Sequence, residues 1–259
     1  MRKLISTLAA ISCAATLAAQ QPTTMKPEDT ELWSPVPPVV TPGVLPGLPP
    51  SDAIVLFDGK NLDEWVSVKD GSPAGWKVAD GVFTVEKSTG DIMTKRKFTN
   101  YQLHIEYRIP VNVAGSGQAR GNSGVFLARL PDSTVFELQV LDSYQNSTYV
   151  NGMAGSFYKQ SIPLVNAARK PGEWNTYDVV WTAPTFRADG SLATPAYATV
   201  LWNGVLVDDH FELKGVTKYI GLPHYTPYTS APIALQAHGD PSEPISFRRI
   251  WVRELYLAH

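Results

Sequence analysis

Two short stretches of the sequence pair polar side chains in a way that could support acid–base chemistry. The stretch FELQVLD carries Glu137 and Gln139 between apolar residues, and the stretch IALQAH carries Gln236 and His238 in the same alternation. A period of two is typical of a β-strand, so each polar pair is expected on one face, about 7 Å apart. If both pairs line one surface, a carboxyl group, an imidazole and two amides converge there. Such a set can bind hydroxyl groups and move protons.

Other polar residues are placed by the sequence near these two strands. Asn122 comes just before a predicted strand and is expected at the rim of the cleft, whereas Arg129 is expected at the far end of that strand. Both are candidates for binding substrate. His224 lies in a long loop, where with Tyr225 and Tyr228 it is a candidate for a wall of the cleft. Long loops in compact β-proteins often carry function.

The sequence predicts that the elements holding these residues are β-strands, because apolar residues show little helical periodicity. Asp80-Gly81 and Asn203-Gly204 are typical of tight hairpin turns. A shift in apolar phase predicts a bulge at Arg248-Arg249. Long loops remain at residues 142–173 and 213–232. Strands are predicted for residues 54–57, 76–79, 82–86, 101–110, 123–128, 135–141, 174–182, 198–202, 205–209, 233–237 and 245–257.

These strands predict an all-β fold of the sandwich or barrel type. The predicted strand at residues 101–110 alternates cleanly between Leu103 and its apolar neighbours on one side and polar residues on the other. The polar side includes His104, which is therefore expected to face away from the core.

The first residues of the chain predict that the protein is exported. Arg2 and Lys3 precede an apolar run that ends near Ala19, the pattern of a secretory signal over residues 1–19. The run is too short for a membrane span. The alternative is a lipoprotein anchored through Cys13. Either processing route predicts a secreted or periplasmic protein.

The next segment, residues 20–50, holds nine of the 21 prolines of the chain and one aromatic residue, Trp33. This composition favours extended polyproline conformations, so the segment is predicted to be a linker or a strap lying over the domain. Residues 51–259 then form one domain.

Composition excludes several classes of function. Hydrophobic residues at 44% and charged residues at 18% describe a globular chain, and a net charge of -2 gives no electrostatic footprint for nucleic acid or an anionic membrane. The His and Cys residues lack the spacing of zinc ligands. A divalent cation such as calcium, held by loop carboxylates such as Asp132 or Asp142, stays open because oxygen ligands leave little trace in a sequence.

Five motifs occur in order over about residues 55–257. They are LFDGKNLDEW (56–65), GNSGVF (121–126), ELQVLD (137–142), GEWNTY (172–177) and LQAHG (235–239). Together they resemble the 3-keto-disaccharide hydrolase family, and the resemblance implies a concanavalin A-like jelly roll of two curved antiparallel sheets. It also implies a secreted or periplasmic protein that acts on sugars whose C3 hydroxyl is oxidised to a ketone.

One of these motifs is also similar to the catalytic strand of retaining glucanases, with Glu137, Gln139 and Asp142 as counterparts of its acidic residues. Retaining hydrolysis needs two carboxyl groups about 5 to 5.5 Å apart. Gln139 does not ionise, and Asp142, a candidate for binding substrate, falls on the opposite face unless a bulge turns it. The resemblance therefore does not imply a conventional double displacement.

A 3-keto sugar allows a different route, since the ketone acidifies the proton on C2. Cleavage by elimination through an enolate needs one base, an electrophile near the C3 oxygen and an acid for the leaving group. His238 or Glu137 is the expected base, and the other member of that pair the acid. Gln139, Gln236, Asn122 or a bound cation is expected to stabilise the enolate.

The leading hypothesis is thus a secreted enzyme that cleaves 3-keto-disaccharides or 3-keto-glucosides by hydrolysis or elimination. A noncatalytic carbohydrate-binding module is the alternative, with Trp65, Trp76 or Tyr158 as aromatic platforms, because one fold serves many functions. A structural surface protein is a third. The identity of the sugar and the oligomeric state stay open.

Overall fold

The computed structural model describes residues 25–256 of the 259-residue chain. The predicted signal sequence and Cys13 lie outside these residues. Two compact units divide the chain, Met1–Val39 and Val40–His259. In the described part of the first unit, the short 3-10 helix η1 (Pro27–Thr30) begins at Lys26, whose backbone N–H donates to the Asp29 carboxylate. The second unit holds all the elements discussed below.

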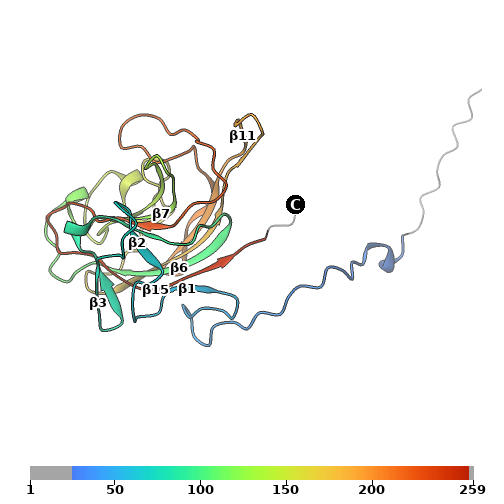
Figure 1. Ribbon diagram of the computed structural model, residues 1–259, viewed down its shortest axis with the longest axis horizontal. Coiled ribbons are helices and arrows are strands. Elements are labelled where there is room, and N and C mark those ends of the chain that lie inside the picture. Colours follow the sequence, from blue (N-terminus) through green and yellow to red (C-terminus); the bar gives the residue numbers. More distant parts are fainter. Residues whose placement is uncertain (1–24, 257–259) are drawn as a thin grey trace, which may run out of the picture. The chain divides into compact units, whose positions relative to one another are not determined.

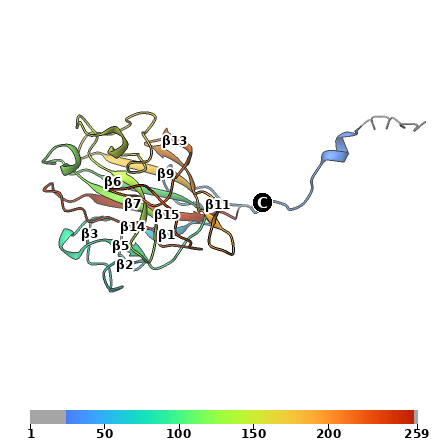
Figure 2. The ribbon, with the colours of Figure 1, turned by 90° about the horizontal axis from the view of Figure 1, so that it is seen from above.

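Two antiparallel sheets form the body of the second unit (Figures 1 and 2). In the larger sheet the order is β13-β12-β9-β6-β15-β4-β3, with β1 also paired to β15. Its strands are β1 (Ile54–Phe57), β3 (Lys77–Ala79), β4 (Val82–Thr84), β6 (Tyr101–Arg108), β9 (Trp174–Thr182), β12 (Tyr197–Trp202), β13 (Val205–Glu212) and β15 (Ser246–Glu254).

The smaller sheet has the order β2-β5-β14-β7-β8. Its strands are β2 (Trp65–Ser67), β5 (Ile92–Thr94), β7 (Ser123–Arg129), β8 (Val135–Val140) and β14 (Ala234–Leu235). A separate hairpin pairs β10 (Thr185–Phe186) with β11 (Leu192–Thr194). Short 3-10 helices lie in the connections between strands, at η2 (Lys87–Thr89), η3 (Gly117–Ala119) and η4 (Val150–Gly152).

Local backbone geometry confirms the predicted turns and bulge. Asp80 and Asn203 adopt φ angles of 52° and 54°, which the following glycines continue, so both turns match the right-handed twist of their strands. The register between β15 and β6 shifts between Arg248 and Trp251, where Arg249 has φ 46°. This bulge lets β15 follow the curvature of the larger sheet.

The core lies between the two sheets. Leu103 and Tyr107 of β6 and Leu138 and Val140 of β8 are completely buried. The all-β jelly-roll sandwich predicted from the sequence is confirmed. Trp65 is also buried in this core, as is Trp76, which stacks near Phe83 and Phe247, so the expectation that either tryptophan forms an aromatic platform for sugar is wrong.

A strap of residues 40–50 covers part of the outer face of the larger sheet. The Trp251 indole donates to the Gly47 carbonyl at 3.0 Å, and Gly47 lies directly on the His104 ring. His104 is 2% exposed, stacks on Trp251 and hydrogen-bonds Asp178 at 2.7 Å. It points away from the core as predicted, and it is buried because the strap covers this part of the outer face.

Within residues 25–256, no helix is long and apolar enough to cross a membrane.

Candidate functional site

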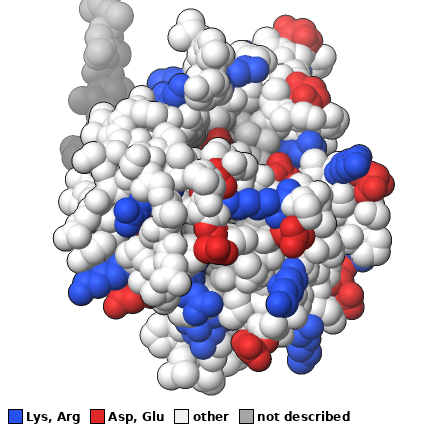
Figure 3. All heavy atoms as spheres, turned by 90° about the vertical axis from the view of Figure 1, so that its left-hand side faces the viewer, with Lys and Arg blue, Asp and Glu red and all other residues white. Residues whose placement is uncertain are grey.

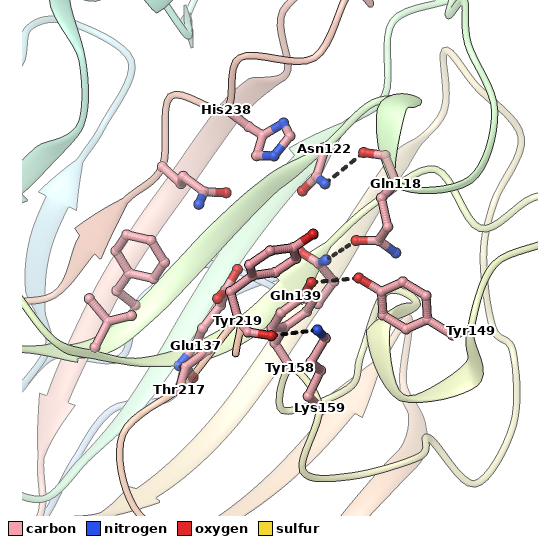
Figure 4. A pocket seen from close by; sticks show the side chains of 13 residues that line it. Gln118, Asn122, Glu137, Gln139, Tyr149, Tyr158, Lys159, Thr217, Tyr219 and His238 are labelled. Atoms are coloured by element: carbon pink, nitrogen blue, oxygen red, sulfur yellow. Dashed lines mark hydrogen bonds between the residues drawn. The ribbon is translucent and has the colours of Figure 1, made fainter. Parts of the chain in front are cut away.

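A cavity of about 590 Å³ opens on the face of the smaller sheet that points away from the core (Figure 4). The sheet and its strand ends supply Asn122, Phe126, Glu137, Gln139, Gln236 and His238. The two long loops supply the opposite wall with Tyr149, Tyr158, Lys159, Thr217 and Tyr219, and η3 supplies Gln118. The two polar strand pairs of the sequence do converge on one surface.

Glu137 is buried in the wall of this cavity, with 8% of its surface exposed. Burial, reinforced by the nearby charge of Asp91, raises the pKa of the Glu137 carboxyl to about 8. Gly124 on the neighbouring strand makes room for the carboxyl group, because a Cβ at Gly124 would lie 2.9 Å from Glu137 Oε1. Glu137 therefore holds a proton at neutral pH and can donate it.

Gln139 presents an acceptor to the same cavity. Its amide nitrogen donates to Gln118 Oε1 at 3.1 Å and to the Gly152 carbonyl at 3.3 Å. These two bonds fix the amide orientation and leave Oε1 buried with no protein partner among the described residues. A buried acceptor of this kind needs a donor, such as a sugar hydroxyl. Gln236 Oε1 is also buried without a protein partner.

Gln236 and His238 follow the end of β14. The Gln236 N–H donates to the Gly124 carbonyl at 3.0 Å, so the chain continues along β7 after the strand ends. The next residue, Ala237, donates its N–H to the Asp91 carboxylate at 2.8 Å. Asp91 was not predicted as a site residue. It anchors the segment that carries the amide and the imidazole.

The His238 ring is held by Asp240. Its Nδ1 lies 3.4 Å from Asp240 Oδ1 and 3.2 Å from the Asp240 backbone nitrogen. With a proton on Nδ1 the ring donates to the carboxylate and Nε2 can accept a proton. With the proton on Nε2, Nδ1 accepts from the backbone N–H. Nδ1 thus has a hydrogen-bond partner in either tautomer of the ring. This suits a group that takes up a proton and later returns it.

Asp240 is fixed in turn by its own partners. Its side chain is 1% exposed, and Lys87 Nζ lies 3.2 Å from Oδ1, while Ser242 donates its hydroxyl to Oδ2. Burial alone would raise the pKa of Asp240, but hydrogen bonds from His238, Ser242 and Lys87 hold it far below its usual value. The group beside His238 is therefore a carboxylate.

Tyrosines and one lysine close the mouth of the cavity (Figure 4). The hydroxyls of Tyr149 and Tyr158 lie 2.5 Å apart. Lys159 donates to the Tyr219 carbonyl at 2.6 Å and lies 4.3 Å from the centre of the Tyr219 ring. These contacts join the loop after β8 to the loop after β13. Only Tyr158 was singled out from the sequence, because loop residues follow no period.

Asp142 does not reach the cavity. Its side chain is 1% exposed and forms an ion pair with Arg120, whose Nε lies 2.5 Å from Oδ2. Its other oxygen accepts the Tyr144 N–H at 3.1 Å. The expectation that Asp142 binds substrate has no support in its position, since the chain after β8 turns the carboxylate toward Arg120.

Arg129 and His224 also lie outside the lining of the cavity. Arg129 donates to the Ser133 hydroxyl at 3.3 Å, at the far end of β7 as predicted. His224 is exposed, and Tyr225 in the same loop lies 6.0 Å from Phe136, ring centre to ring centre, against the core. This loop therefore contributes Thr217 and Tyr219 to the cavity rather than the predicted histidine wall.

The described residues offer no group of three or more His, Cys, Asp or Glu side chains that could hold a metal ion. Asp132, a suggested calcium ligand, accepts the backbone N–H and the hydroxyl of Thr134. Asp142, the other suggested ligand, is paired with Arg120. Both carboxylates are therefore taken up by protein partners and do not fit a cation site.

Comparisons with known proteins agree with this fold. A family described as the 3-keto-alpha-glucoside-1,2-lyase-like domain matches residues 52–253. A solved structure of a Parabacteroides distasonis protein, assigned provisionally as a glycosyl hydrolase, is 57% identical, has a TM-score of 0.84, and covers 89% of this chain and 97% of its own. Among curated proteins, no sequence matches this chain.

Two further solved structures come from the same organism and carry the same provisional assignment. They are 21% and 23% identical to this chain, with TM-scores of 0.58 and 0.55. They cover 79% and 78% of this chain, and 94% and 99% of their own chains. At this identity they show the fold alone. The family match and the 57% identical structure make this chain a glycosyl hydrolase-like, carbohydrate-active protein. The resemblance of its motifs is confirmed, and the chain belongs to the family of 3-keto-alpha-glucoside-1,2-lyase-like domains.

Proposed function

We propose that the cavity cleaves the glycosidic bond of a 3-keto-glucoside by elimination across C1 and C2. The observation that carries the proposal is that Glu137 is the one carboxylic acid among the described residues lining the cavity, and that it is protonated at neutral pH. A conventional glycosidase needs two carboxyl groups flanking the bond, and Gln139 stands where a second would be expected. Elimination needs only one acid, together with a separate base.

His238 is the base in this proposal. With its Nδ1 proton donated to Asp240, His238 Nε2 accepts the proton from C2 of the sugar, whose acidity comes from the adjacent ketone. The electron pair of the C2–H bond forms the C1–C2 double bond through an enolate. The carboxylate of Asp240 stabilises the imidazolium that results.

The enolate oxygen on C3 needs a hydrogen-bond donor. Gln236 and Asn122 both line the cavity, and each has an amide N–H without a partner among residues 25–256. Gln139 is less suited to this role than the sequence suggested, because its two N–H groups already donate to Gln118 and Gly152. Donors placed in advance where negative charge develops are a large source of rate enhancement. We therefore assign the enolate contact to Gln236 and Asn122, and a sugar hydroxyl to Gln139.

Glu137 completes the step as the acid. As the C1–O bond breaks, the electron pair leaves with the oxygen, and Glu137 gives that oxygen its proton. The products are an alcohol and a 3-keto sugar with a double bond between C1 and C2. Addition of water across that bond, with a proton returned to C2, yields the free 3-keto sugar. Hydrolysis is then elimination followed by hydration.

The acid role of Glu137 is tested by varying the leaving group. The full chain and its Glu137→Gln variant are given 3-keto-glucosides that release either an alkanol or an acidic phenol. The variant is expected to lose about 10²- to 10⁴-fold in rate with the alkanol, and much less with the phenol, which leaves without help. Glu173→Gln, on an exposed turn, is the matched control. Equal losses with both substrates would remove Glu137 as the acid.

A carbohydrate-binding role without catalysis is the second candidate. It is favoured by the tyrosines at the mouth and by the unpartnered acceptors Gln139 and Gln236, which would serve a lectin equally well. The two candidates differ in turnover. Saturable binding of a 3-keto-glucoside with no product formed over long incubation would support binding alone.

A further inference from the structure

A second hollow, separate from the cavity, lies on the outer face of the larger sheet. Its volume is about 540 Å³, and it shares no lining residue with the cavity on the smaller sheet. It is formed where strands β3, β4, β6, β9 and β15 lie side by side, beyond the part of this face that the strap covers. Lys77, Thr84, Arg108, Trp174 and Arg248 line it, with Asp80 as its one acidic residue among those described.

Two guanidinium groups meet at one indole in this hollow. The Cζ atom of Arg248 lies 4.1 Å from the centre of the Trp174 ring, and that of Arg108 lies 4.7 Å from it. Arg108 and Trp174 are directly opposite each other on β6 and β9. The aromatic ring attracts both cations and holds them on a rigid sheet rather than on a loop.

The positive charge of the hollow is only partly compensated. Arg248 pairs with Glu106 on β6. Arg108 and Lys77 form no ion pair with any described carboxylate, although Arg108 is only half-exposed. Two like charges against one ring repel each other, and an anion between them removes that repulsion. The planar edge of a guanidinium suits a carboxylate or sulfate, which it binds with two hydrogen bonds.

The size of the hollow favours a sugar over a bare ion. A volume of about 540 Å³ is close to that of the cavity on the smaller sheet, and it falls in the range of sites for small organic ligands. Thr84, whose hydroxyl lies 2.9 Å from that of Ser246, adds a polar side chain to the lining of the hollow. On the side of the molecule that Figure 3 draws, Lys and Arg are interspersed with Asp and Glu. The net charge of the chain is -2, so the positive charge of the hollow is a local feature.

We propose that this hollow is a second saccharide-binding site, specific for a sugar that carries a carboxylate or a sulfate group. Arg108 binds the anionic group, with Lys77 and Arg248 beside it. The site does not take part in the elimination. It holds the protein on acidic glycans while the cavity on the other sheet stays free for its substrate.

The test is calorimetric titration of the full chain at low salt with four probes. These are trigalacturonate for the carboxylate, a heparin-derived tetrasaccharide for the sulfate, cellotriose as the neutral sugar, and sodium sulfate as the bare ion. We expect saturable binding of one acidic oligosaccharide, weakened by added salt. Arg108→Gln should weaken it by at least about tenfold, as expected for loss of a charge-assisted hydrogen bond. Arg187→Gln, an equal change of charge on the β10–β11 hairpin, should leave it unchanged.

The proposal is overturned if no acidic oligosaccharide binds, or if binding is the same in Arg108→Gln as in the unaltered chain. Sulfate binding as tightly as the oligosaccharides would also overturn it, since the site would then recognise an ion rather than a sugar. Lys77→Gln, at an exposed position, gives a second reading if Arg108→Gln does not fold. Turnover of a small 3-keto-glucoside should be unaffected by either variant, so this test and that of the proposed function fail separately.

Discussion

Replacing Glu137 with glutamine should stabilise the fold, and increasingly so as the pH rises. The side chain is buried, and its pKa is raised from 4.5 to about 8. In the unfolded chain the same carboxyl group ionises freely above pH 4.5. Below that pH both states hold the proton, and the group costs no stability. As the pH rises from 4.5 to 8 the unfolded state gives up its proton first, so the folded state loses stability relative to it.

The size of this effect follows from the difference in pKa between the two states. Each pKa unit corresponds to about 1.4 kcal/mol, so a difference of about 3.5 units gives about 5 kcal/mol at pH 9 and about 3 kcal/mol at pH 7. The glutamine variant keeps the shape of the side chain and has no proton to lose. Its free energy of unfolding, relative to that of the unaltered chain, should therefore increase by these amounts between pH 4.5 and pH 9.

Urea unfolding of both chains at several pH values measures this difference. Asp208 is also buried, and burial raises its pKa to about 7, but it is present in both chains and cancels in the comparison. Glu173→Gln serves as the control for loss of an exposed carboxylate. A stability difference that stays constant from pH 4.5 to pH 9 would refute the argument, because Glu137 would then not hold its proton in the folded state.

Three further substitutions test the surroundings of the site. Asp91→Asn removes the negative charge near Glu137 but keeps a hydrogen-bond acceptor, so the Glu137 pKa should fall and the alkaline limb of the pH–rate profile should move to lower pH. Gly124→Ala places a Cβ 2.9 Å from Glu137 Oε1, and the displaced carboxyl should lower turnover by about 10²-fold, measured on a 3-keto-glucoside. Arg120→Ala leaves Asp142 buried without its partner, so urea unfolding should show a loss of about 3–5 kcal/mol.

Two of these substitutions have a control within the chain. For Gly124→Ala it is Gly239→Ala, because a Cβ there meets no atom within 4 Å, and this variant should keep its activity. For Arg120→Ala it is the double variant with Asp142→Asn, which should recover part of the lost stability. An unchanged alkaline limb in Asp91→Asn would show that burial alone sets the Glu137 pKa.

Hairpins and alternating strands were predictable because their signals are local. Asp80-Gly81 and Asn203-Gly204 mark turns by their need for positive φ, and β1 and β9 have the predicted bounds. The strands β2 and β5 were not predicted, because three residues are too few to show a period. Burial of His104 was missed for another reason. It depends on the strap, some sixty residues earlier in the chain.

In the candidate site, too, the residues on strands were predictable and those on loops were not. Glu137, Gln139, Gln236 and His238 share a face because strand alternation puts them there, and the cavity does bring them together. Lys159 comes from a loop whose position depends on long-range contacts that no periodicity encodes. Asp142 and His224, the other candidates from the two long loops, lie outside the cavity, where Asp142 pairs with Arg120 and His224 is exposed.

Cleavage of a 3-keto-glucoside with deuterium at C2 is the most direct test of the central claim. The full chain is incubated with this substrate, with its undeuterated form, and with the parent glucoside that has no ketone, and release of the aglycone is followed by NMR. Elimination predicts that deuterium at C2 slows the reaction, that the unsaturated 3-keto sugar forms, and that the parent stays intact. Equal rates for the two keto substrates, with the parent also cleaved, would contradict elimination and point to a conventional glycosidase.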